Sequence, residues 1–183
     1  MNRALFLDRD GVINVDHGYI GKVADFDVLP GVFDALAQAQ ALDFRLIVVT
    51  NQSGIARGYF TAADYQAVER HMIDLFAERG VHFTGIYHCP HHPSGAAPAL
   101  ALACDCRKPA PGMIRRACAD HDIDPARSLL VGDKQSDLDA GAAAGVGYLF
   151  QVGDRPDGVR RFGSLAELIG SPPFRGIAKG LAA

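Results

Sequence analysis

The chain has 183 residues with a formal net charge of −3, and 49% of its residues are hydrophobic. That length suits a single domain over residues 1–183 with an insertion at residues 89–106, and the acidic balance is unlike that of a nucleic-acid-binding protein. Only four apolar residues separate Arg3 from Asp8, too few for a signal-peptide core or a membrane span. We therefore expect a cytoplasmic monomer whose partner is a small molecule, with no nucleic acid and no membrane.

Five apolar runs predict β-strands, and each is followed by a helical pattern. The run at residues 46–49 is apolar without alternation, which indicates burial on both faces of a sheet. Repeated strand–helix units of this kind are typical of an α/β fold with a doubly wound parallel sheet, a Rossmann-like three-layer sandwich. A loosely packed tail is expected at residues 171–183. The predicted strands are 4–7, 45–50, 85–89, 128–131 and 147–152, and the predicted helices are 31–42, 61–79, 112–121, 135–144 and 164–169.

Two aspartates, Asp8 and Asp10, come directly after the first predicted strand. Side chains at i and i+2 leave a strand on the same side, so we expect both carboxylates to face one point beyond the carboxyl edge of the sheet. Open α/β sheets bind their ligands at that edge. In such a pair one carboxylate attacks an electrophile while the other transfers a proton, and an exposed turn is the alternative interpretation.

Further polar residues follow the other predicted strands. Thr50 ends the second strand, and Asp133 and Asp137 follow the fourth. The cations Arg107 and Lys108 stand just before a predicted helix. Three carboxylates at one edge repel one another unless a cation joins them, and oxygen ligands favour Mg²⁺. A hydroxyl, a lysine and Mg²⁺ around a carboxylate nucleophile make a phosphoryl-transfer site.

Four motifs resemble, in order and spacing, those of the haloacid dehalogenase (HAD) superfamily of phosphatases. The resemblance implies that Asp8 is the nucleophile that forms an aspartyl-phosphate, and that Asp10 protonates the leaving oxygen and then activates water. It implies that Thr50 and Lys108 bind the phosphoryl group. No cap-sized insertion separates the motifs, so we expect a HAD-like domain without a cap. The motifs are Asp8-Arg9-Asp10-Gly11, Thr50-Asn51-Gln52-Ser53-Gly54, Lys108-Pro109 and Gly132-Asp133-x-x-x-Asp137.

The same resemblance implies a set of ligands for the catalytic Mg²⁺. Asp8, the backbone carbonyl of Asp10, and Asp133 would ligate the ion. Asp137 would hold a metal-bound water. Lys134 would reach the substrate or bridge the carboxylates.

Three of the four cysteines lie in the Pro- and Ala-rich insertion. Cys89 and His91 are spaced two apart, as are Cys104 and Cys106, so both side chains of each pair face one side of an extended segment. Three thiolates and one imidazole suit a structural Zn²⁺ site without an open position. His92 remains an alternative fourth ligand, and free thiols are the alternative to a metal. Zinc would position the cations that follow the insertion.

Within the superfamily, the insertion and the first motif resemble the branch that contains the heptose bisphosphate and histidinol-phosphate phosphatases. The runs at residues 16–19, 50–58 and 89–93 resemble the heptose enzymes in particular. This implies Mg²⁺-dependent removal of the C7 phosphate of heptose 1,7-bisphosphate, giving heptose 1-phosphate for nucleotide-activated heptose and lipopolysaccharide core biosynthesis. Histidinol phosphate is the alternative substrate. The implied substrate contacts are Asp16, His17, Gly18, Tyr19, Asn51, Gln52, Ser53, Arg107 and Lys134.

Two hypotheses of another class compete with a phosphatase. A catalytically silent phosphosugar-binding protein would have little need of both Asp8 and Asp10. A zinc-dependent nucleic-acid module would need a basic face with interleaved aromatic residues, which does not fit this acidic chain. The sequence therefore favours an enzyme.

Overall fold

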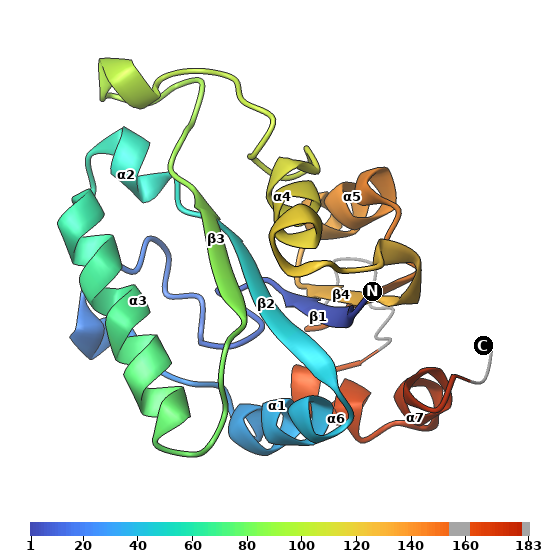
Figure 1. The fold of residues 1–183 in the computed structure, drawn as a ribbon. Coiled ribbons are helices and arrows are strands. Elements are labelled where there is room, and N and C mark those ends of the chain that lie inside the picture. The colour runs from blue at the N-terminus through green and yellow to red at the C-terminus, as the bar shows by residue number, and fades with distance from the viewer. Residues whose placement is uncertain (154–161, 181–183) are drawn as a thin grey trace.

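A parallel sheet of five strands lies at the centre of the structure, a computed structural model that describes residues 1–153 and 162–180 (Figure 1). The strands are ordered β3-β2-β1-β4-β5, and all neighbours run parallel. The chain order reverses at β1, which confirms the predicted doubly wound sheet. The strands are β1 (Arg3–Leu7), β2 (Phe44–Asn51), β3 (Gly85–Cys89), β4 (Leu129–Gly132) and β5 (Tyr148–Gln151).

Helices cover both faces of the sheet. They are α1 (Val32–Ala41), α2 (Gly54–Arg57), α3 (Ala62–Ala77), α4 (Gly112–His121), α5 (Gln135–Ala144), α6 (Leu165–Ile169) and α7 (Pro172–Ala178). Leu5 and Val48 belong to one hydrophobic core with α1, α3, α6 and α7, whereas Phe6 and Ile47 belong to a second core with α4 and α5. Successive strand side chains point to opposite faces, so the unbroken apolar runs fill both cores. Figure 1 shows α1 and α6 on one side of the sheet and α4 and α5 on the other.

Helix α3 begins where its sequence predicts. The Thr61 hydroxyl accepts a hydrogen bond from the Asp64 amide at 3.1 Å, and the Asp64 carboxylate accepts one from the Thr61 amide at 2.8 Å, which makes a capping box. The helix ends at Ala77, two residues earlier than predicted, and Gly80 follows with a φ of +72°. Helix α2 has only four residues, too few to show a helical period in the sequence.

The C-terminal segment packs against the first core, so the prediction of a loose tail over residues 171–183 is wrong for α7. Phe174 is fully buried, and its ring centroid lies 5.6 Å from that of Phe44. The two prolines that open α7 suggest a break in the sequence, but proline is favoured in the first turn of a helix. Residues 181–183 lie outside the described residues.

The insertion between β3 and α4 leaves the carboxyl edge of the sheet and passes close to α2 (Figure 1). The amide of Ala97 donates to the carbonyl of Ala56 at 2.9 Å, which ties the insertion to α2. A single domain over residues 1–183 stays a prediction. Among the helices of the described residues, none has the length and apolar character needed to cross a lipid bilayer.

Candidate active site

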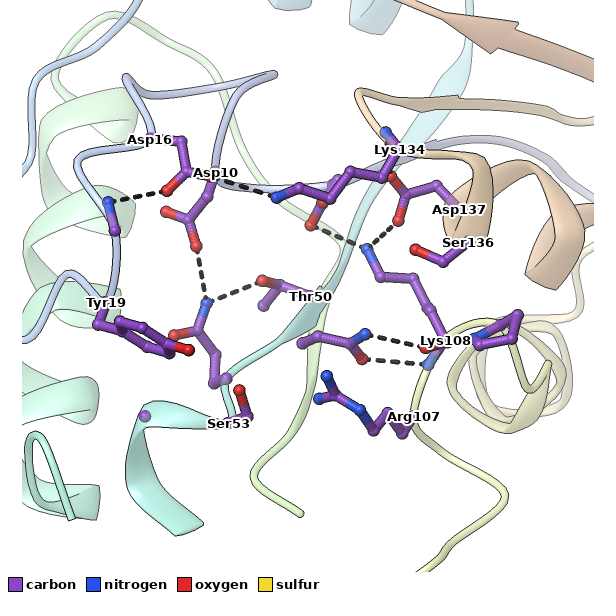
Figure 2. A pocket seen from close by; sticks show the side chains of 16 residues that line it. Asp10, Asp16, Tyr19, Thr50, Ser53, Arg107, Lys108, Lys134, Ser136 and Asp137 are labelled. Carbon is purple, nitrogen blue, oxygen red and sulfur yellow. Dashed lines mark hydrogen bonds and ion pairs between the residues drawn. The ribbon is translucent and has the colours of Figure 1, made fainter. Parts of the chain in front are cut away.

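A cavity of about 600 Å³ opens at the carboxyl edge of the sheet, beyond the ends of β1 and β2 (Figure 2). The first turn of α5 contributes Ser136 and Asp137 to its wall, and the start of α2 contributes Gly54. The structure brings most of the predicted site residues together at this cavity, although they come from distant parts of the chain. Those that line it are Asp8, Asp10, Asp16, Gly18, Tyr19, Thr50, Asn51, Gln52, Ser53, Arg107, Lys108 and Lys134.

Lys108 lies between two carboxylates in this cavity (Figure 2). Its Nζ is 2.9 Å from Asp8 Oδ1 and 2.6 Å from Asp137 Oδ1, and it donates to the carbonyl of Val49 at 2.8 Å. Burial alone would lower the pKa of the Lys108 ammonium, but Asp8 and Asp137 raise it above its usual value. The lysine is therefore a fixed positive charge.

Asp8 is a buried carboxylate with one anchored oxygen. Burial raises its pKa to about 7, because the attraction of Lys108 offsets burial only in part and the charges of Asp137 and Asp133 add to it. Oδ1 accepts hydrogen bonds from Lys108 and from the Arg9 amide, the latter at 2.7 Å. Within the described part of the chain no donor contacts Oδ2. The free oxygen is available for attack on an electrophile.

Three carboxylates form a group that suits a divalent cation. Oxygen atoms of Asp8, Asp133 and Asp137 lie within 4.8 Å of one another. Oδ1 of Asp133 is buried and has no hydrogen-bond partner among the described residues, and burial raises the pKa of this carboxyl. Gly11, with a φ of +83°, lets the chain approach Asp133 closely, since a Cβ there would lie 2.7 Å from Asp133 Oδ2. Buried carboxylate oxygens in excess of the nearby positive charge fit Mg²⁺.

The Asp10 carboxylate is held by its own set of donors and does not join this group. Oδ1 accepts from Arg9 Nε at 3.1 Å, from Arg9 Nη2 at 2.9 Å and from Asn14 Nδ2 at 3.0 Å. Oδ2 accepts from Gln52 Nε2 at 3.1 Å and from Arg9 Nη2 at 3.0 Å. Asp8 and Asp10 both line the cavity, but the expected common point is not formed, because the Asp10 carboxylate contacts these donors whereas Asp8 contacts Lys108.

The amide side chains of Asn51 and Gln52, at the end of β2, make hydrogen bonds to other groups of the site. Gln52 Nε2 donates to Thr50 Oγ1 at 2.8 Å as well as to Asp10, so it links the hydroxyl to the carboxylate (Figure 2). Asn51 makes two hydrogen bonds of 3.1 Å with the backbone amide and carbonyl of Lys108. Both side chains are therefore engaged with protein groups, and their contact with a substrate stays a prediction.

The loop after β1 places its residues in two directions. Asp16 faces the cavity, and its Oδ2 lies 3.2 Å from Lys134 Nζ. His17 instead pairs with Asp27, with 2.8 Å between Nε2 and Oδ2, and is not among the residues that line the cavity. Asp16 lies at the cavity, and its contact with the substrate stays a prediction. The position of His17 gives no support to the same prediction for that residue.

The rim of the cavity carries cations and aromatic rings. Lys134 Nζ lies 3.5 Å from Asp133 Oδ2, so it bridges this carboxylate and the loop after β1. Arg107 donates from Nη1 to the carbonyl of His91 at 3.4 Å. Tyr19 is half exposed, and its ring packs edge-on against Tyr59 with the centroids 4.6 Å apart. Lys134 and Arg107 are the rim cations able to meet an anionic substrate.

Three thiols and one imidazole of the insertion come together beside the cavity. Cys106 Sγ lies 3.1 Å from Cys89 Sγ and 3.2 Å from Cys104 Sγ, and His91 Nδ1 lies 3.3 Å from Cys106 Sγ. All four ligand atoms lie within 4.8 Å of one another. Burial raises the pKa of the Cys89 thiol. A set of three sulfur atoms and one nitrogen suits a tetrahedral Zn²⁺ site.

The alternative ligand His92 points elsewhere. Its Nε2 lies 2.9 Å from Arg57 Nη2, at the end of α2, and its Nδ1 accepts a hydrogen bond from the Ser94 amide at 3.0 Å. Of the two candidate histidines, His91 is the one in the cluster. The contact between His92 and Arg57 fastens the insertion to α2.

The chain is similar to several named phosphatases. Residues 105–150 match a family described as HAD-hydrolase-like. The chain is 50% identical over 144 residues to the D-glycero-β-D-manno-heptose-1,7-bisphosphate 7-phosphatase of Escherichia coli strain K12, across 79% of this chain and 75% of the relative. It is 51% identical to the protein of that name from Vibrio cholerae serotype O1, across 79% and 77% of the two chains. The chain belongs to this family of HAD-like phosphatases.

Solved structures agree with this membership. A D,D-heptose 1,7-bisphosphate phosphatase from B. bronchiseptica, solved with magnesium and phosphate, matches with a TM-score of 0.77 and 34% identity, across 91% of this chain and 96% of that chain. A protein from Mesorhizobium loti described as a HAD-like phosphatase matches with a TM-score of 0.85 and 37% identity, across 100% and 88% of the chains. These matches confirm the predicted HAD-like fold.

In this member of the family, some site residues have no signal in the sequence. Arg9 and Asn14 hold Asp10, and Ser136 lines the cavity. Alternate residues at the end of a strand point to the same side, so the pattern selects Asp8 and Asp10 as site residues and passes over Arg9, which lies between them. Because Arg9 stands between Asp8 and Asp10 in a charged motif, its charge alone does not show that it has a buried partner.

Proposed function

We propose that this protein removes the C7 phosphate of D-glycero-β-D-manno-heptose 1,7-bisphosphate and leaves heptose 1-phosphate. The observation that carries the proposal is the identity of about half the residues, over four fifths of the chain, with enzymes named for that reaction. The geometry of Asp8 and Lys108 supports the reaction class, because a buried carboxylate beside a fixed cation suits attack on a phosphoryl group.

In the first step, Asp8 is the nucleophile. Its Oδ2 forms a bond to phosphorus while the bond from phosphorus to the C7 oxygen breaks, and Asp10 gives a proton to that oxygen. Lys108 and Thr50 bind the transferring phosphoryl group, whose negative charge is spread over three oxygens. The product of this step is an aspartyl-phosphate and a free sugar hydroxyl.

In the second step, Asp10 acts as a base. It takes a proton from a water molecule whose oxygen bonds to phosphorus, and the bond between phosphorus and Asp8 breaks. Inorganic phosphate leaves, and Asp8 regains its carboxylate. Asp10 ends the cycle protonated, ready to act as an acid again.

Mg²⁺ would be held by Asp8, Asp133 and the backbone carbonyl of Asp10, with Asp137 in support. The ion supplies positive charge that lets a carboxylate and a phosphate dianion approach each other. The buried Oδ1 of Asp133, which has no hydrogen-bond partner within residues 1–153 and 162–180, supports this assignment. Asp137 keeps Lys108 in place through its contact of 2.6 Å.

Zn²⁺ would be held by Cys89, His91, Cys104 and Cys106, and its role would be structural. Arg107 follows the last of these ligands directly and contacts the carbonyl of His91. A metal that fixes this segment therefore fixes the guanidinium, which offers a planar fork to the second phosphate of the substrate.

The substrate contacts away from phosphorus are expected at the cavity rim. Asp16, Gly18 and Tyr19 line the cavity on the side of the loop after β1, and Ser53 lies at the start of α2. We propose that these residues face the sugar and that Lys134 faces its polar groups. His17 would have to leave Asp27 to take part.

The test is a comparison of substrates. We expect kcat/KM for the β anomer of the heptose bisphosphate to exceed that for the α anomer and for histidinol phosphate by at least about tenfold, or about 1.4 kcal/mol. Phosphate release is measured with Mg²⁺, and NMR of the product shows which phosphate remains. Equal or better turnover of histidinol phosphate would overturn the substrate while keeping the reaction class.

A further inference from the structure

Arg9 is buried although it carries a full charge. It is 1% exposed, and it is the largest of the fully buried side chains in the described part of the chain. Its guanidinium contacts Asp10 and lies 5.8 Å from the centre of the Tyr65 ring, while Nη1 is buried without a hydrogen-bond partner among the described residues. Burying a charge is costly unless it is paired, and an apolar side chain would fill the same space more cheaply. This cost points to a role for the pair with Asp10.

We propose that Arg9 is a positioning residue that orients the Asp10 carboxylate for proton transfer to the leaving oxygen. The proposal rests on the proposed phosphatase function. Among the donors that contact Asp10, Arg9 is the one that reaches both carboxylate oxygens, through Nη2 at 2.9 and 3.0 Å. Asn14 contacts only Oδ1, and Gln52 contacts only Oδ2. Two contacts from one rigid, planar group fix the rotation of the carboxylate about its bond to Cβ.

The two oxygens of Asp10 differ in their surroundings. Oδ1 accepts three hydrogen bonds, two from Arg9 and one from Asn14, and is the anchored oxygen. Oδ2 lies on the side of Gln52, whose amide also contacts the hydroxyl of Thr50. Since Thr50 binds the phosphoryl group in the proposed mechanism, Oδ2 is the oxygen that faces the reaction. Oδ2 is therefore the oxygen from which Asp10 would transfer a proton, and Arg9 restrains the carboxylate through contacts with both of its oxygens.

The need for this proton depends on the leaving group. When the bond from phosphorus to a sugar oxygen breaks, the alkoxide formed is a strong base and must be protonated as it leaves. When the same bond to 4-nitrophenolate breaks, the leaving anion is stable and departs without a proton. In both cases Asp8 forms the new bond to phosphorus. A wrongly oriented Asp10 should therefore slow cleavage of the sugar phosphate and leave cleavage of the aryl phosphate nearly unchanged.

The test compares Arg9→Gln with the unchanged protein on both esters. The quantity measured is kcat/KM, which covers the steps up to departure of the leaving group and excludes hydrolysis of the aspartyl-phosphate. We expect kcat/KM for the heptose bisphosphate to fall roughly 10- to 100-fold, which is less than the roughly 100- to 10,000-fold contribution of a general acid because Asp10 is misoriented and not removed. The value for 4-nitrophenyl phosphate should fall less than about threefold. Arg9→Lys, which keeps a buried cation without the planar fork, should give an intermediate ratio, and it serves as the test if Arg9→Gln does not fold.

A matched control is Arg3→Gln at the other end of β1. Arg3 donates to the backbone carbonyls of Ala178 and Leu42, far from the cavity, so its loss should lower the melting temperature without changing the ratio of the two esters. Adding Arg9→Gln to Asp10→Asn should produce no further loss on the sugar ester, because the two residues act as one unit.

An equal loss on both esters, or no loss on either, would overturn the role of Arg9 in proton transfer. Failure of the unchanged protein to release phosphate from the heptose bisphosphate would instead overturn the proposed function. The two failures are thereby distinguished.

Discussion

Asp8 shows how a single side chain is prepared for attack on phosphorus. Burial removes its solvation and raises its pKa to about 7, and Lys108 together with the Arg9 amide holds one oxygen. The other oxygen carries no protein hydrogen bond in the described residues, so it loses none on reaction. Fixed donors that need no rearrangement at the moment of reaction are the main source of rate enhancement in such sites.

The first prediction concerns the loss of this nucleophile. Asp8→Asn should lower kcat at least about 1000-fold, since no other carboxylate can form the covalent intermediate. Mass spectrometry of protein quenched during turnover should show a phosphorylated Asp8 peptide in the unchanged protein and none in the variant. Phosphate release that persisted in the variant would contradict covalent catalysis by Asp8. The melting temperature should not fall, because the variant removes one of several crowded negative charges while Lys108 keeps Asp137.

Residues at strand ends could be predicted from the sequence, and residues that act through a neighbour could not. Asp8 and Thr50 follow from apolar runs that end in polar groups. Asn51 was expected to face the substrate, yet it binds the backbone of Lys108, 57 positions along the chain. The sequence indicates no separate role for Arg9. Contacts of this kind depend on how the loops fold in three dimensions, which local sequence patterns do not predict.

At the scale of elements, we expect the insertion after β3 to depend on zinc held by Cys89, His91, Cys104 and Cys106. Leu100 packs against the small cluster of Ile55, Phe60 and Tyr65, which is a limited apolar anchor for a segment of this length, so a bound metal would add much of its stability. We expect about one Zn²⁺ per chain in the unchanged protein and in the control Cys118→Ser, and a much smaller content in Cys104→Ser. Elemental analysis measures the metal, and the melting temperature should fall with it. His92→Ala should retain zinc, and loss of zinc in that variant would contradict the ligand set.

The same variant should affect substrate binding more than chemistry. Loss of zinc frees the segment that carries Arg107, so KM for the bisphosphate should rise by about tenfold or more, the worth of a charge-assisted pair. The value of kcat should change much less, because Asn51 still holds Lys108. Steady-state kinetics with Cys118→Ser as the reference separates the two constants. A fall in kcat at constant KM would assign the insertion a different role.

Helix α7 closes the first core at the end of the sheet opposite the active site. Phe174→Ala should lower the free energy of unfolding by about 3–5 kcal/mol, since it deletes a fully buried ring. Denaturation by urea measures the change, and Ile73→Ala, at a residue 40% exposed, should alter the free energy by less than about 0.5 kcal/mol. At a temperature where the variant is folded, kcat/KM should be unaffected. A stability change as small as that of the control would mean that α7 does not pack as described.

The regular elements were largely predictable because hydrophobic runs and capping residues are local signals. All five strands and the longer helices appear within two residues of their predicted bounds. Helix α7 could not be predicted because it is stabilised by a contact between Phe174 and Phe44, two residues that lie far apart in the sequence. Helix α2 could not be predicted because its four residues are too few to show the helical spacing of apolar side chains.

At the scale of the whole molecule, the carboxylates of the active site link stability to pH and to Mg²⁺. The pKa of Asp8 is about 7 in the native state and 3.8 in the unfolded chain, so the native state binds more protons between these values. Without Mg²⁺, stability should therefore fall as pH rises from about 4 to about 7. Since Mg²⁺ and protons compete for the same oxygens, the ion should stabilise the protein more at pH 8 than at pH 5.

Thermal unfolding at several pH values, with and without MgCl₂ and with no chelator that would remove zinc, measures both effects. Asp8→Asn should lose most of the pH dependence in this range and most of the stabilisation by Mg²⁺. A Tm increase with Mg²⁺ that is the same at pH 5 and pH 8 would show that the ion binds elsewhere.

The reversal of strand order at β1 has a consequence for how the molecule fluctuates. The strands that carry Asp8, Thr50 and Asp133 at their ends are the three inner ones, each hydrogen-bonded on both sides, whereas the insertion leaves from the edge strand β3. Backbone amides of inner strands exchange with solvent only when the whole sheet opens. Hydrogen exchange should therefore be slowest in β1 and faster in the insertion, so the floor of the site keeps its geometry until global unfolding while the segment that carries its rim opens in smaller, local events.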